Sequence, residues 1–333
     1  GLRNYLYDID YSRSFEYDIM VINVGNLRVG GTGKTPMIEY LIRLLHKRYA
    51  VATLSRGYKR KTKGFILADA TSTSTQIGDE PYQMYLKYGD VAKVSVGEER
   101  SLAIPYILME HPETQVVLLD DAYQHREVRP DLNILLTDFN MPFYEDHLLP
   151  AGRLRESRSG AKRADIIIVT KSPEDLDSEM RSSITASIKK YSRPTAPIFF
   201  TGLQYGNIRN ASGRELSTAN KYLVFSGLAN ATPFETHCAN TVEVVDTVNF
   251  RDHYDYSVED FELLVEKANA SGADLLTTEK DVVKLKEQRF LDLLGKTSLC
   301  YIPVAHKFVE DGSIFEARIF EQIEEKYSLE DQA

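Results

Sequence analysis

Residues 24–35 read Val24-Gly25-Asn26-Leu27-Arg28-Val29-Gly30-Gly31-Thr32-Gly33-Lys34-Thr35. An apolar run at 19–24 predicts a β-strand at the start of this stretch, and the pattern at 36–48 predicts a helix after it. The glycines in the loop allow backbone N–H groups to turn toward an anion, and the helix N-terminus adds a favourable dipole. This strand, loop and helix are together typical of a loop that binds phosphate groups.

The residues of this loop are candidate nucleotide ligands, namely Asn26, Gly30, Gly31, Thr32, Gly33, Lys34 and Thr35. Lys34 would reach the β- and γ-phosphates of ATP, and Thr35 would offer its hydroxyl to Mg²⁺. Arg28 stands where the general pattern has its first glycine, so the entrance of the loop must differ from the usual one. The alternative is a structural turn that happens to end in Gly-Lys-Thr.

The first half of the chain alternates predicted strands and helices. Beyond the strand at 19–24, apolar runs predict strands at 51–54, 116–119, 134–136 and 166–169. Continuous apolar strands suit a parallel sheet that helices cover on both faces. The sequence therefore predicts an α/β fold, with a P-loop NTPase-type parallel-sheet domain.

A linker is predicted at 194–197, where two prolines interrupt helix formation. We place a boundary within some tens of residues of position 190, which gives an ATP-binding domain at 1–190 and a smaller α/β domain at 191–333. In the second half, strands are expected at 198–204, 222–226, 242–245, 274–277 and 298–304. Helices are expected there at 258–270, 281–288 and 321–326.

Two carboxylates, Asp120 and Asp121, end the apolar strand at 116–119. A buried strand delivers its last residues to the carboxyl edge of the sheet, where ligands bind in open α/β folds. Beside a phosphate loop, one or both carboxylates would hold Mg²⁺. A helix-capping role is the alternative for an Asp in this position.

The composition excludes several classes of protein. The 333-residue chain has a net charge of −9, which argues against a nucleic-acid partner, because such binding needs many Lys and Arg contacts. Cys238 and Cys300 lack metal-ligand spacing, which points to a reducing compartment and to no zinc site. No apolar run approaches the ~20 residues of a membrane span, so the chain as given is expected to be soluble.

The start of the chain leaves two interpretations open. It begins at Gly1 rather than Met, so an upstream segment could anchor the protein to a membrane. The opening stretch carries Leu2, Leu6 and Tyr7 together with Arg3, which fits the end of an interfacial amphipathic helix. A first helix packed on the core is the alternative.

The motif set resembles that of the tetraacyldisaccharide 4'-kinase family of lipid A biosynthesis. That family has a loop of the form GNLxVGGTGKTP, which residues 25–36 match, including the departure at position 28. Further family motifs occur in the same order, as SRGY at 55–58, GDEP at 78–81, DDAYQH at 120–125, LLPAGRLRE at 148–156, Asp252-His253 and TTEKDVVKL at 277–285. The match spans nearly the whole chain. Ala122 and Tyr123 replace the Gly and Phe of the family's DDGFQH motif.

The resemblance implies a kinase that transfers the ATP γ-phosphate to the 4'-hydroxyl of an acylated glucosamine disaccharide 1-phosphate in a membrane. It also implies that Asp79 accepts the hydroxyl proton and that His253 orients or tunes Asp79. The chemistry agrees, since a sugar hydroxyl is a poor nucleophile until a base takes its proton. His253 lies in the second half, so the smaller domain would close over the active site. Without the family, Asp79 fits a turn or helix cap, and His253 fits a surface histidine.

Glu156 resembles the family's additional acidic residue near the metal, and a solvated loop glutamate is the alternative. Arg56, Arg153 and Arg155 are candidate ligands for the anionic substrate, because guanidinium donors form a planar fork that suits phosphate. For these cations the alternative is a charged, solvated surface.

Two other functions are compatible with a phosphate loop. One is a P-loop NTPase switch that hydrolyses nucleotide to regulate a partner, and the other is a nucleotide-binding module without chemistry. A GTPase-type switch predicts a guanine-reading N-K-x-D motif, which the sequence lacks. No protein partner is implied. The lipid substrate places the expected site of action at the cytoplasmic face of the bacterial inner membrane, with the chain peripheral or anchored by an upstream segment.

Overall fold

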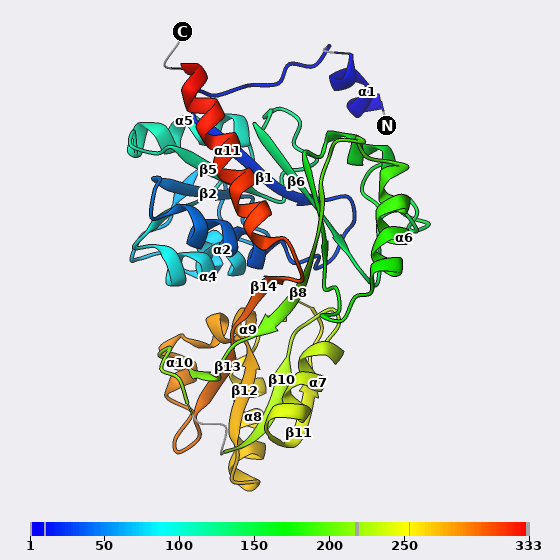
Figure 1. The fold of residues 1–333 in the computed structure, drawn as a ribbon. Coiled ribbons are helices and arrows are strands. Elements are labelled where there is room, and N and C mark those ends of the chain that lie inside the picture. Colours follow the sequence, from blue (N-terminus) through cyan, green and yellow to red (C-terminus); the bar gives the residue numbers. More distant parts are fainter. Residues whose placement is uncertain (1, 10, 217–219, 253, 331–333) are drawn as a thin grey trace. The chain divides into compact units, whose positions relative to one another are not determined.

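The computed structural model describes residues 2–9, 11–216, 220–252 and 254–330 (Figure 1). The chain divides into two compact units. Unit 1 comprises Gly1–Leu203 and His306–Ala333, and unit 2 comprises Gln204–Ala305. Unit 2 is therefore inserted into the sequence of unit 1.

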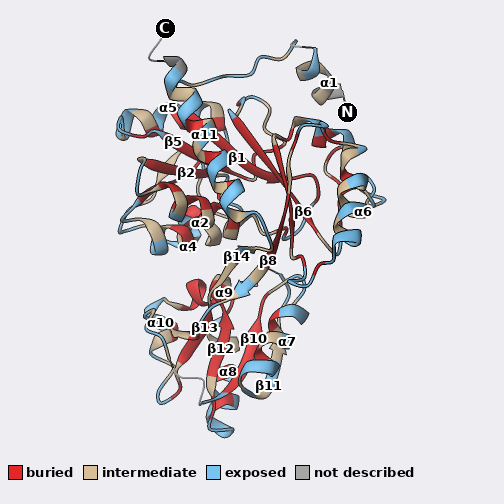
Figure 2. Ribbon diagram, in the orientation of Figure 1, coloured by how far each residue is buried: buried red, intermediate tan, exposed pale blue. Residues whose placement is uncertain are grey.

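The core of unit 1 is a sheet in which the described strands follow the order β14-β8-β7-β6-β1-β5-β2-β4-β3. The strands are β1 (Met20–Asn26), β2 (Val51–Ser55), β3 (Ile66–Leu67), β4 (Ala92–Val96), β5 (Val116–Asp120), β6 (Leu132–Asp138), β7 (Ile166–Thr170), β8 (Ile198–Tyr205) and β14 (Val304–Phe308). The central pairs from β4 through β8 are parallel, and β3 pairs with β4 in the antiparallel sense. The central strands are buried along their length (Figure 2), as expected for a parallel sheet covered on both faces.

Helices cover both faces of this sheet (Figure 1). The described helices of unit 1 are α1 (Leu2–Asp8), which lies apart from these faces, α2 (Lys34–Leu45), α3 (Ser74–Ile77), α4 (Asp79–Tyr88), α5 (Arg100–Glu110), the 3₁₀ helix η1 (Arg158–Arg163), α6 (Ser178–Lys189) and α11 (Gly312–Glu330). Alternate residues of β1 point to opposite faces, so Ile22 packs in the core beneath α2 and α11, whereas Val21 packs against α5.

Unit 2 is a smaller α/β unit whose described strands follow the order β11-β10-β12-β13-β9. Its strands are β9 (Arg209–Asn210), β10 (Lys221–Ser226), β11 (Glu243–Asn249), β12 (Asp274–Thr278) and β13 (Leu299–Ile302). Its helices are α7 (Thr232–Thr241), α8 (Val258–Ala270), α9 (Glu279–Val282), η2 (Val283–Leu285) and α10 (Gln288–Leu291). The pairs between β11 and β13 are parallel, and β9 adds an antiparallel edge.

The structure departs from the expected domain organisation at the end of the chain. The run at 298–304, expected as one strand, splits into β13 of unit 2 and β14, which joins the sheet of unit 1. Residues 306–333 then belong to unit 1, although the sequence placed them in the second domain. The physical reason is burial, because Phe315, Ile319 and Ile323 lie in the same core cluster as Met20. The helix expected at 281–288 is also broken into α9 and η2.

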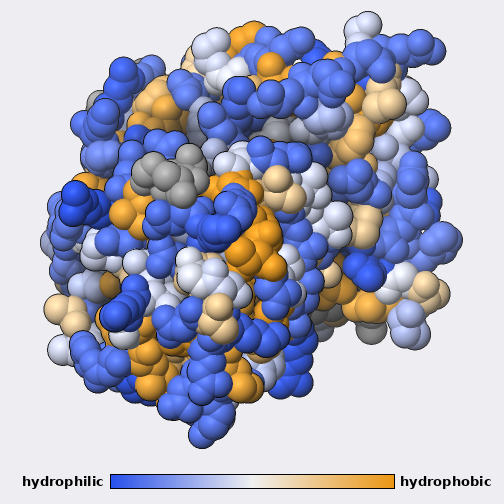
Figure 3. All heavy atoms as spheres, turned by 90° about the horizontal axis from the view of Figure 1, so that it is seen from below, coloured by the Kyte–Doolittle hydropathy of each residue, from blue (hydrophilic) through white to orange (hydrophobic). Residues whose placement is uncertain are grey.

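The face drawn in Figure 3 is mainly hydrophilic, with hydrophobic areas between the hydrophilic side chains. Within the described part of the chain, every helix is too short or too polar to span a lipid bilayer.

Candidate active site

The phosphate loop connects β1 to α2 at the carboxyl edge of the sheet. Gly33 caps the helix with φ 84°, and Gly30 has φ 117°, values that side-chain-bearing residues rarely adopt. Asn26, fully buried at the end of β1, donates from Nδ2 to Thr32 Oγ1 at 2.7 Å. The glycines thus allow the turn, and Asn26 fixes the loop from inside.

Arg28 explains why this loop needs no glycine at its entrance. Its backbone forms an antiparallel bridge with Leu154, and its side chain is buried away from the loop. Arg28 Nη1 donates to the Met141 carbonyl at 2.9 Å, and Nε lies 3.3 Å from Asp146 Oδ2. The bridge places the segment around Leu154 beside the phosphate loop, and Arg155 follows directly.

The two acidic residues lie next to the loop because β5 pairs with β1. Val24 is the register partner of Asp120, and the Asp121 N–H donates to the Val24 carbonyl at 3.0 Å. Burial and the nearby Glu80 carboxylate raise the pKa of Asp120 to about 7, against the opposing charge of Lys34. Asp120 Oδ1 is buried and has no hydrogen-bond partner among the described residues.

Asp121 lies in a different electrostatic environment. Its carboxylate accepts two bonds from the Arg155 guanidinium, at 3.1 Å and 2.7 Å, and lies 3.7 Å from Lys34 Nζ. Burial would raise the pKa of Asp121, but the charges of Lys34 and Arg155 outweigh it and hold the pKa below its usual value. Arg155 also donates to Asn26 Oδ1, so the predicted loop, carboxylate and arginine residues form one cluster.

The donor set fits a magnesium ion that is held partly by nucleotide. In the described residues no three His, Cys, Asp or Glu side chains gather into a metal site of their own. Mg²⁺ is usually held by one or two carboxylates, with phosphate and water oxygens completing its shell. The bare Asp120 Oδ1 is the kind of buried oxygen that a divalent cation would satisfy.

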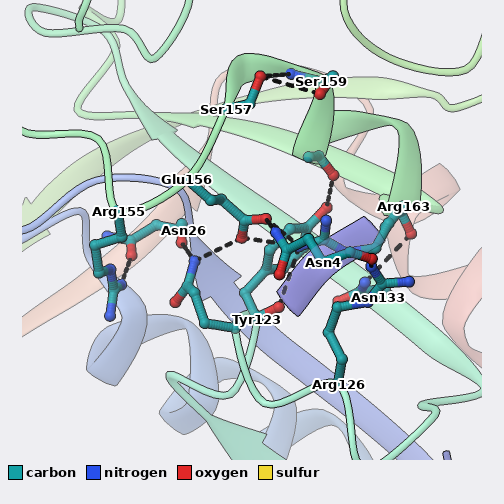
Figure 4. Close-up of polar contacts among 12 residues, drawn as sticks. Asn4, Asn26, Tyr123, Arg126, Asn133, Arg155, Glu156, Ser157, Ser159 and Arg163 are labelled. Atoms are coloured by element: carbon teal, nitrogen blue, oxygen red, sulfur yellow. Dashed lines mark hydrogen bonds and ion pairs between the residues drawn. The ribbon is translucent and has the colours of Figure 1, made fainter. Parts of the chain in front are cut away.

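Glu156 is buried and already holds several donors (Figure 4). Its carboxylate accepts from Asn4 Nδ2 at 2.9 Å, from Gln124 Nε2 at 2.9 Å, and from Arg163 Nη2 at 2.8 Å and 2.9 Å. Gln124 Nε2 also donates to the Asn26 carbonyl at 2.9 Å. Glu156 is therefore not a solvated loop residue, and it supports the base of the phosphate loop through Gln124.

Asp79 is the first residue of α4, directly after Gly78, which has φ 94° and ψ 157°. The helix is held against α2 by a buried carboxylate, Glu39, which accepts from Gln83 Nε2 at 3.0 Å and from Lys87 Nζ. Asp79 therefore sits on a fixed helix end within unit 1. The other predicted catalytic residue, His253, lies outside the described residues.

Two predicted substrate ligands are exposed arginines in unit 1. Arg56 follows the last residue of β2, and its charge contributes to the lowered pKa of the buried Arg100. Arg153 accepts a bond at its carbonyl from the Val29 N–H at 2.9 Å, which places its backbone against the phosphate loop. Arg155, in contrast, is bound to Asp121.

The backbone explains why Ala122 can replace the Gly of the family's DDGFQH motif. The backbone of Ala122 does not adopt a positive φ, so the Ala that replaces Gly needs no special conformation. The left-handed residue of this turn is Asp121, with φ 53°.

Thr278 is the N-cap of α9 and accepts from the Asp281 N–H at 3.1 Å. The TTEKD segment thus has a structural role as a helix cap.

Arg100 was not selected from the sequence. It is buried at the start of α5, and Nη1 donates to the Gly97 carbonyl at 2.7 Å. Burial lowers its pKa to about 10, although the Asp120 and Asp121 charges oppose this. The signal in the sequence was an arginine that opens a helix four residues after the end of β4.

The comparisons with known proteins agree with this geometry. The family model described as Tetraacyldisaccharide-1-P 4'-kinase matches residues 1–324. A tetraacyldisaccharide 4'-kinase of Flavobacterium johnsoniae is 43% identical over 330 residues, which cover 98% of this chain and 93% of that protein. One of Bacteroides fragilis is 40% identical over 329 residues, which cover 93% of this chain and 86% of that protein.

A solved structure is also similar. LpxK from Aquifex aeolicus in complex with ATP superimposes with a TM-score of 0.77 at 30% identity, covering 97% of this chain and 94% of that one. The expected α/β kinase fold and the use of ATP with Mg²⁺ are thereby confirmed. This chain belongs to the tetraacyldisaccharide-1-P 4'-kinase family.

Proposed function

We propose that this chain transfers the γ-phosphate of Mg-ATP to the 4'-hydroxyl of a tetraacyldisaccharide 1-phosphate, an acylated glucosamine disaccharide. The observation that carries the proposal is the register of β1 and β5, in which Val24 pairs with Asp120. This register places two strand-terminal carboxylates beside a loop that ends in Lys34, which is the arrangement that phosphoryl transfer requires. The acceptor follows from the names of the relatives.

The triphosphate would rest on the N–H groups of residues 30–35, with Lys34 on the β- and γ-phosphates. Lys34 is held by Asp121 at 3.7 Å in this structure and would turn to the phosphates on binding. The buried amide of Asn26 would keep the loop open through its bond to Thr32.

Thr35, Asp120 and Asp121 would hold Mg²⁺, together with phosphate oxygens. The ion would neutralise negative charge that develops on the phosphates during transfer. Glu156 would affect the ion only indirectly, because Arg163 and Gln124 already donate hydrogen bonds to its carboxylate oxygens. We propose that it acts on the metal site by positioning Gln124 and the loop.

Asp79 would accept the proton of the 4'-hydroxyl as the new P–O bond forms, and His253 would orient or tune that carboxylate. The fixed start of α4 supports this role for Asp79, because Gln83 and Lys87 lock the helix to Glu39. We further propose that unit 2, which carries His253, closes over the nucleotide and excludes water.

Arg56 and Arg153 are proposed ligands for the anionic acceptor, because both are exposed cations beside the nucleotide elements. Arg155, the third proposed ligand, would leave Asp121 when it binds a phosphate of the acceptor. Its planar donors suit either partner.

We propose that the chain works at a membrane surface on the cytoplasmic side of the bacterial inner membrane, where ATP and an acylated substrate meet. Exposed Tyr11 and Phe15 near the N-terminus support this, since aromatic side chains favour the lipid–water interface. Neither a protein partner nor a nucleic acid is needed in this scheme. The purified chain should therefore act alone on lipid acceptor in vesicles or micelles.

The test is a transfer assay with labelled ATP and a panel of acceptors. We expect label on the tetraacyldisaccharide 1-phosphate and not on free sugars or nucleosides. Asp79→Asn should retain Mg-ATP binding and lose transfer by about 10²–10⁴-fold, the usual contribution of a general base. Asp90→Asn, at an exposed position just after α4, is the matched control. Transfer only to non-lipid acceptors would overturn the substrate assignment.

A further inference from the structure

Three consecutive carbonyl groups of the phosphate loop each accept a hydrogen bond from a side chain of another strand or strand end. The bonds are Lys171 Nζ to Gly31 O at 2.7 Å, Thr170 Oγ1 to Thr32 O at 2.9 Å, and His306 Nε2 to Gly33 O at 2.8 Å. A peptide unit is planar and trans, so fixing a carbonyl fixes the next N–H in the opposite direction. The three bonds therefore aim successive N–H groups of the loop away from the strands.

His306 makes the bond nearest to Lys34. It is buried in β14 and also contacts Thr201 Oγ1 through Nδ1, at 3.0 Å. A carbonyl can only accept, so Nε2 carries the proton and Nδ1 accepts from the Thr201 hydroxyl. Burial lowers the pKa of His306 to about 4, which keeps the ring neutral at physiological pH. One tautomer is thus selected by its two partners.

Gly33 depends on this contact in two ways. Its carbonyl also accepts the first helical bond from Met37 N–H, but that bond is longer, at 3.2 Å. A Cβ atom on Gly33 would lie 2.9 Å from the His306 ring, so the imidazole packs directly on the glycine. The left-handed backbone at Gly33 is therefore held both by hydrogen bonding and by packing.

We propose that His306 is a positioning residue for the nucleotide: by holding the Gly33 carbonyl, it keeps the Lys34 N–H directed at the triphosphate. His306 touches no substrate and acts only through Gly33. It is also the first residue of unit 1 after the chain leaves unit 2. The inference rests on the proposed placement of the triphosphate on residues 30–35.

Two amide variants provide the test. The Nε2 of a glutamine can occupy the position of the imidazole Nε2, whereas the shorter asparagine matches only Nδ1. We expect His306→Asn to raise the KM for ATP by roughly tenfold, as loss of one bond to a buried carbonyl would. The KM for the lipid acceptor should not change. His306→Gln should recover most of the ATP affinity, and calorimetry with Mg-ATP should show the same order.

Two controls separate the outcomes. Phe308→Leu lies on the same strand and packs on Phe315, so it should lower the unfolding temperature without changing the KM for ATP. Lys34→Ala tests the loop placement itself. If Lys34→Ala abolishes ATP binding and His306→Asn does not alter it, the role of His306 is wrong while the proposed site stands. If Lys34→Ala binds ATP normally, the proposed site fails.

Two results would overturn the inference directly. One is a His306→Gln variant no better than His306→Asn in ATP affinity. The other is a ¹⁵N spectrum of the folded protein that shows the His306 proton on Nδ1.

Discussion

The ammonium group of Lys34 lies 3.7 Å from Oδ1 of Asp121, and the same carboxylate holds the Arg155 guanidinium with two hydrogen bonds. Two cations therefore face one carboxylate. While Arg155 stays on Asp121, Lys34 can turn to a phosphate without leaving the Asp121 carboxylate as an uncompensated charge. The site can thus exchange one anion for another at its lysine with little rearrangement.

Replacing Lys34 should remove the main positive charge that faces the phosphates. We expect Lys34→Ala to lower kcat/KM by about 10²–10³-fold, the range for losing one group that stabilises developing charge. Lys47→Ala, at an exposed position in the turn after α2, is the control and should match the wild type. Steady-state kinetics with varied ATP would measure both.

Asp120→Asn should raise the stability of the protein and lower its activity. Burial disfavours the charged form of Asp120 and raises its pKa to about 7. At pH 8 the carboxylate is nevertheless ionised, so the folded protein holds a buried charge at a cost in stability. Removing the charge should raise the free energy of unfolding of the nucleotide-free protein by about 1–2 kcal/mol. Phosphoryl transfer should fall sharply because a metal ligand is lost. Urea unfolding without Mg²⁺ measures the first effect, and a variant less stable than wild type would contradict it.

Glu156→Ala should destabilise the protein strongly and change its magnesium requirement only slightly, because Glu156 acts on the metal site indirectly. The buried carboxylate is the ion-pair partner of Arg163, at 2.8 Å, and removing one member of such a pair costs about 3 kcal/mol. Thermal unfolding would show the loss. If stability stays unchanged while the Mg²⁺ concentration for half-maximal activity rises, Glu156 binds the metal directly.

Arg28→Gly would restore the glycine of the general pattern, and we expect it to harm the protein. The change removes the contacts with Asp146 and the Met141 carbonyl and should lower the free energy of unfolding by about 1–3 kcal/mol. Val29→Gly changes the exposed neighbour and should cost less. A more active or more stable Arg28→Gly variant would show that the arginine is not structural.

His306 predicts a pH dependence of stability. Its pKa is about 4 in the folded protein and 6.5 in an unfolded chain, and the charges of Arg43 and Lys171 add to the effect of burial. As pH falls from 6.5 to 4, the unfolded state gains a proton that the folded state does not. The free energy of unfolding should therefore fall, by up to about 3 kcal/mol. Urea unfolding at pH 7.5 and pH 5 should show a smaller decrease for His306→Gln than for the wild type.

Much of the fold could be predicted because its signals are local. The apolar runs that form β1 and β5 and the glycines before Lys34 each define a short element, and parallel pairing then brings Asp120 to the loop. Arg28 could be recognised as unusual, but its partner Asp146 is distant in sequence, and nothing local indicates that pairing.

Long-range packing could not be predicted in the same way. Pro303 divides the run at 298–304 into β13 and β14, but a proline alone does not indicate that the two strands join different sheets. His306 has no motif around it, and its role becomes visible only when β14 lies beside β8 and the ring reaches Gly33. The same holds for Glu156, whose three donors come from α1, the DDAYQH segment and η1.

The insertion of unit 2 into unit 1 has a consequence for synthesis on the ribosome. The last residues of the chain supply Phe315, Ile319 and Ile323 to the first unit's core, and these emerge after all of unit 2. The larger unit consequently cannot complete its hydrophobic interior until these residues have emerged, whereas the inserted unit can fold earlier. A nascent chain stalled before residue 306 should thus expose the sheet face of unit 1 that α11 covers in the complete fold, and it should bind chaperones that recognise apolar surface.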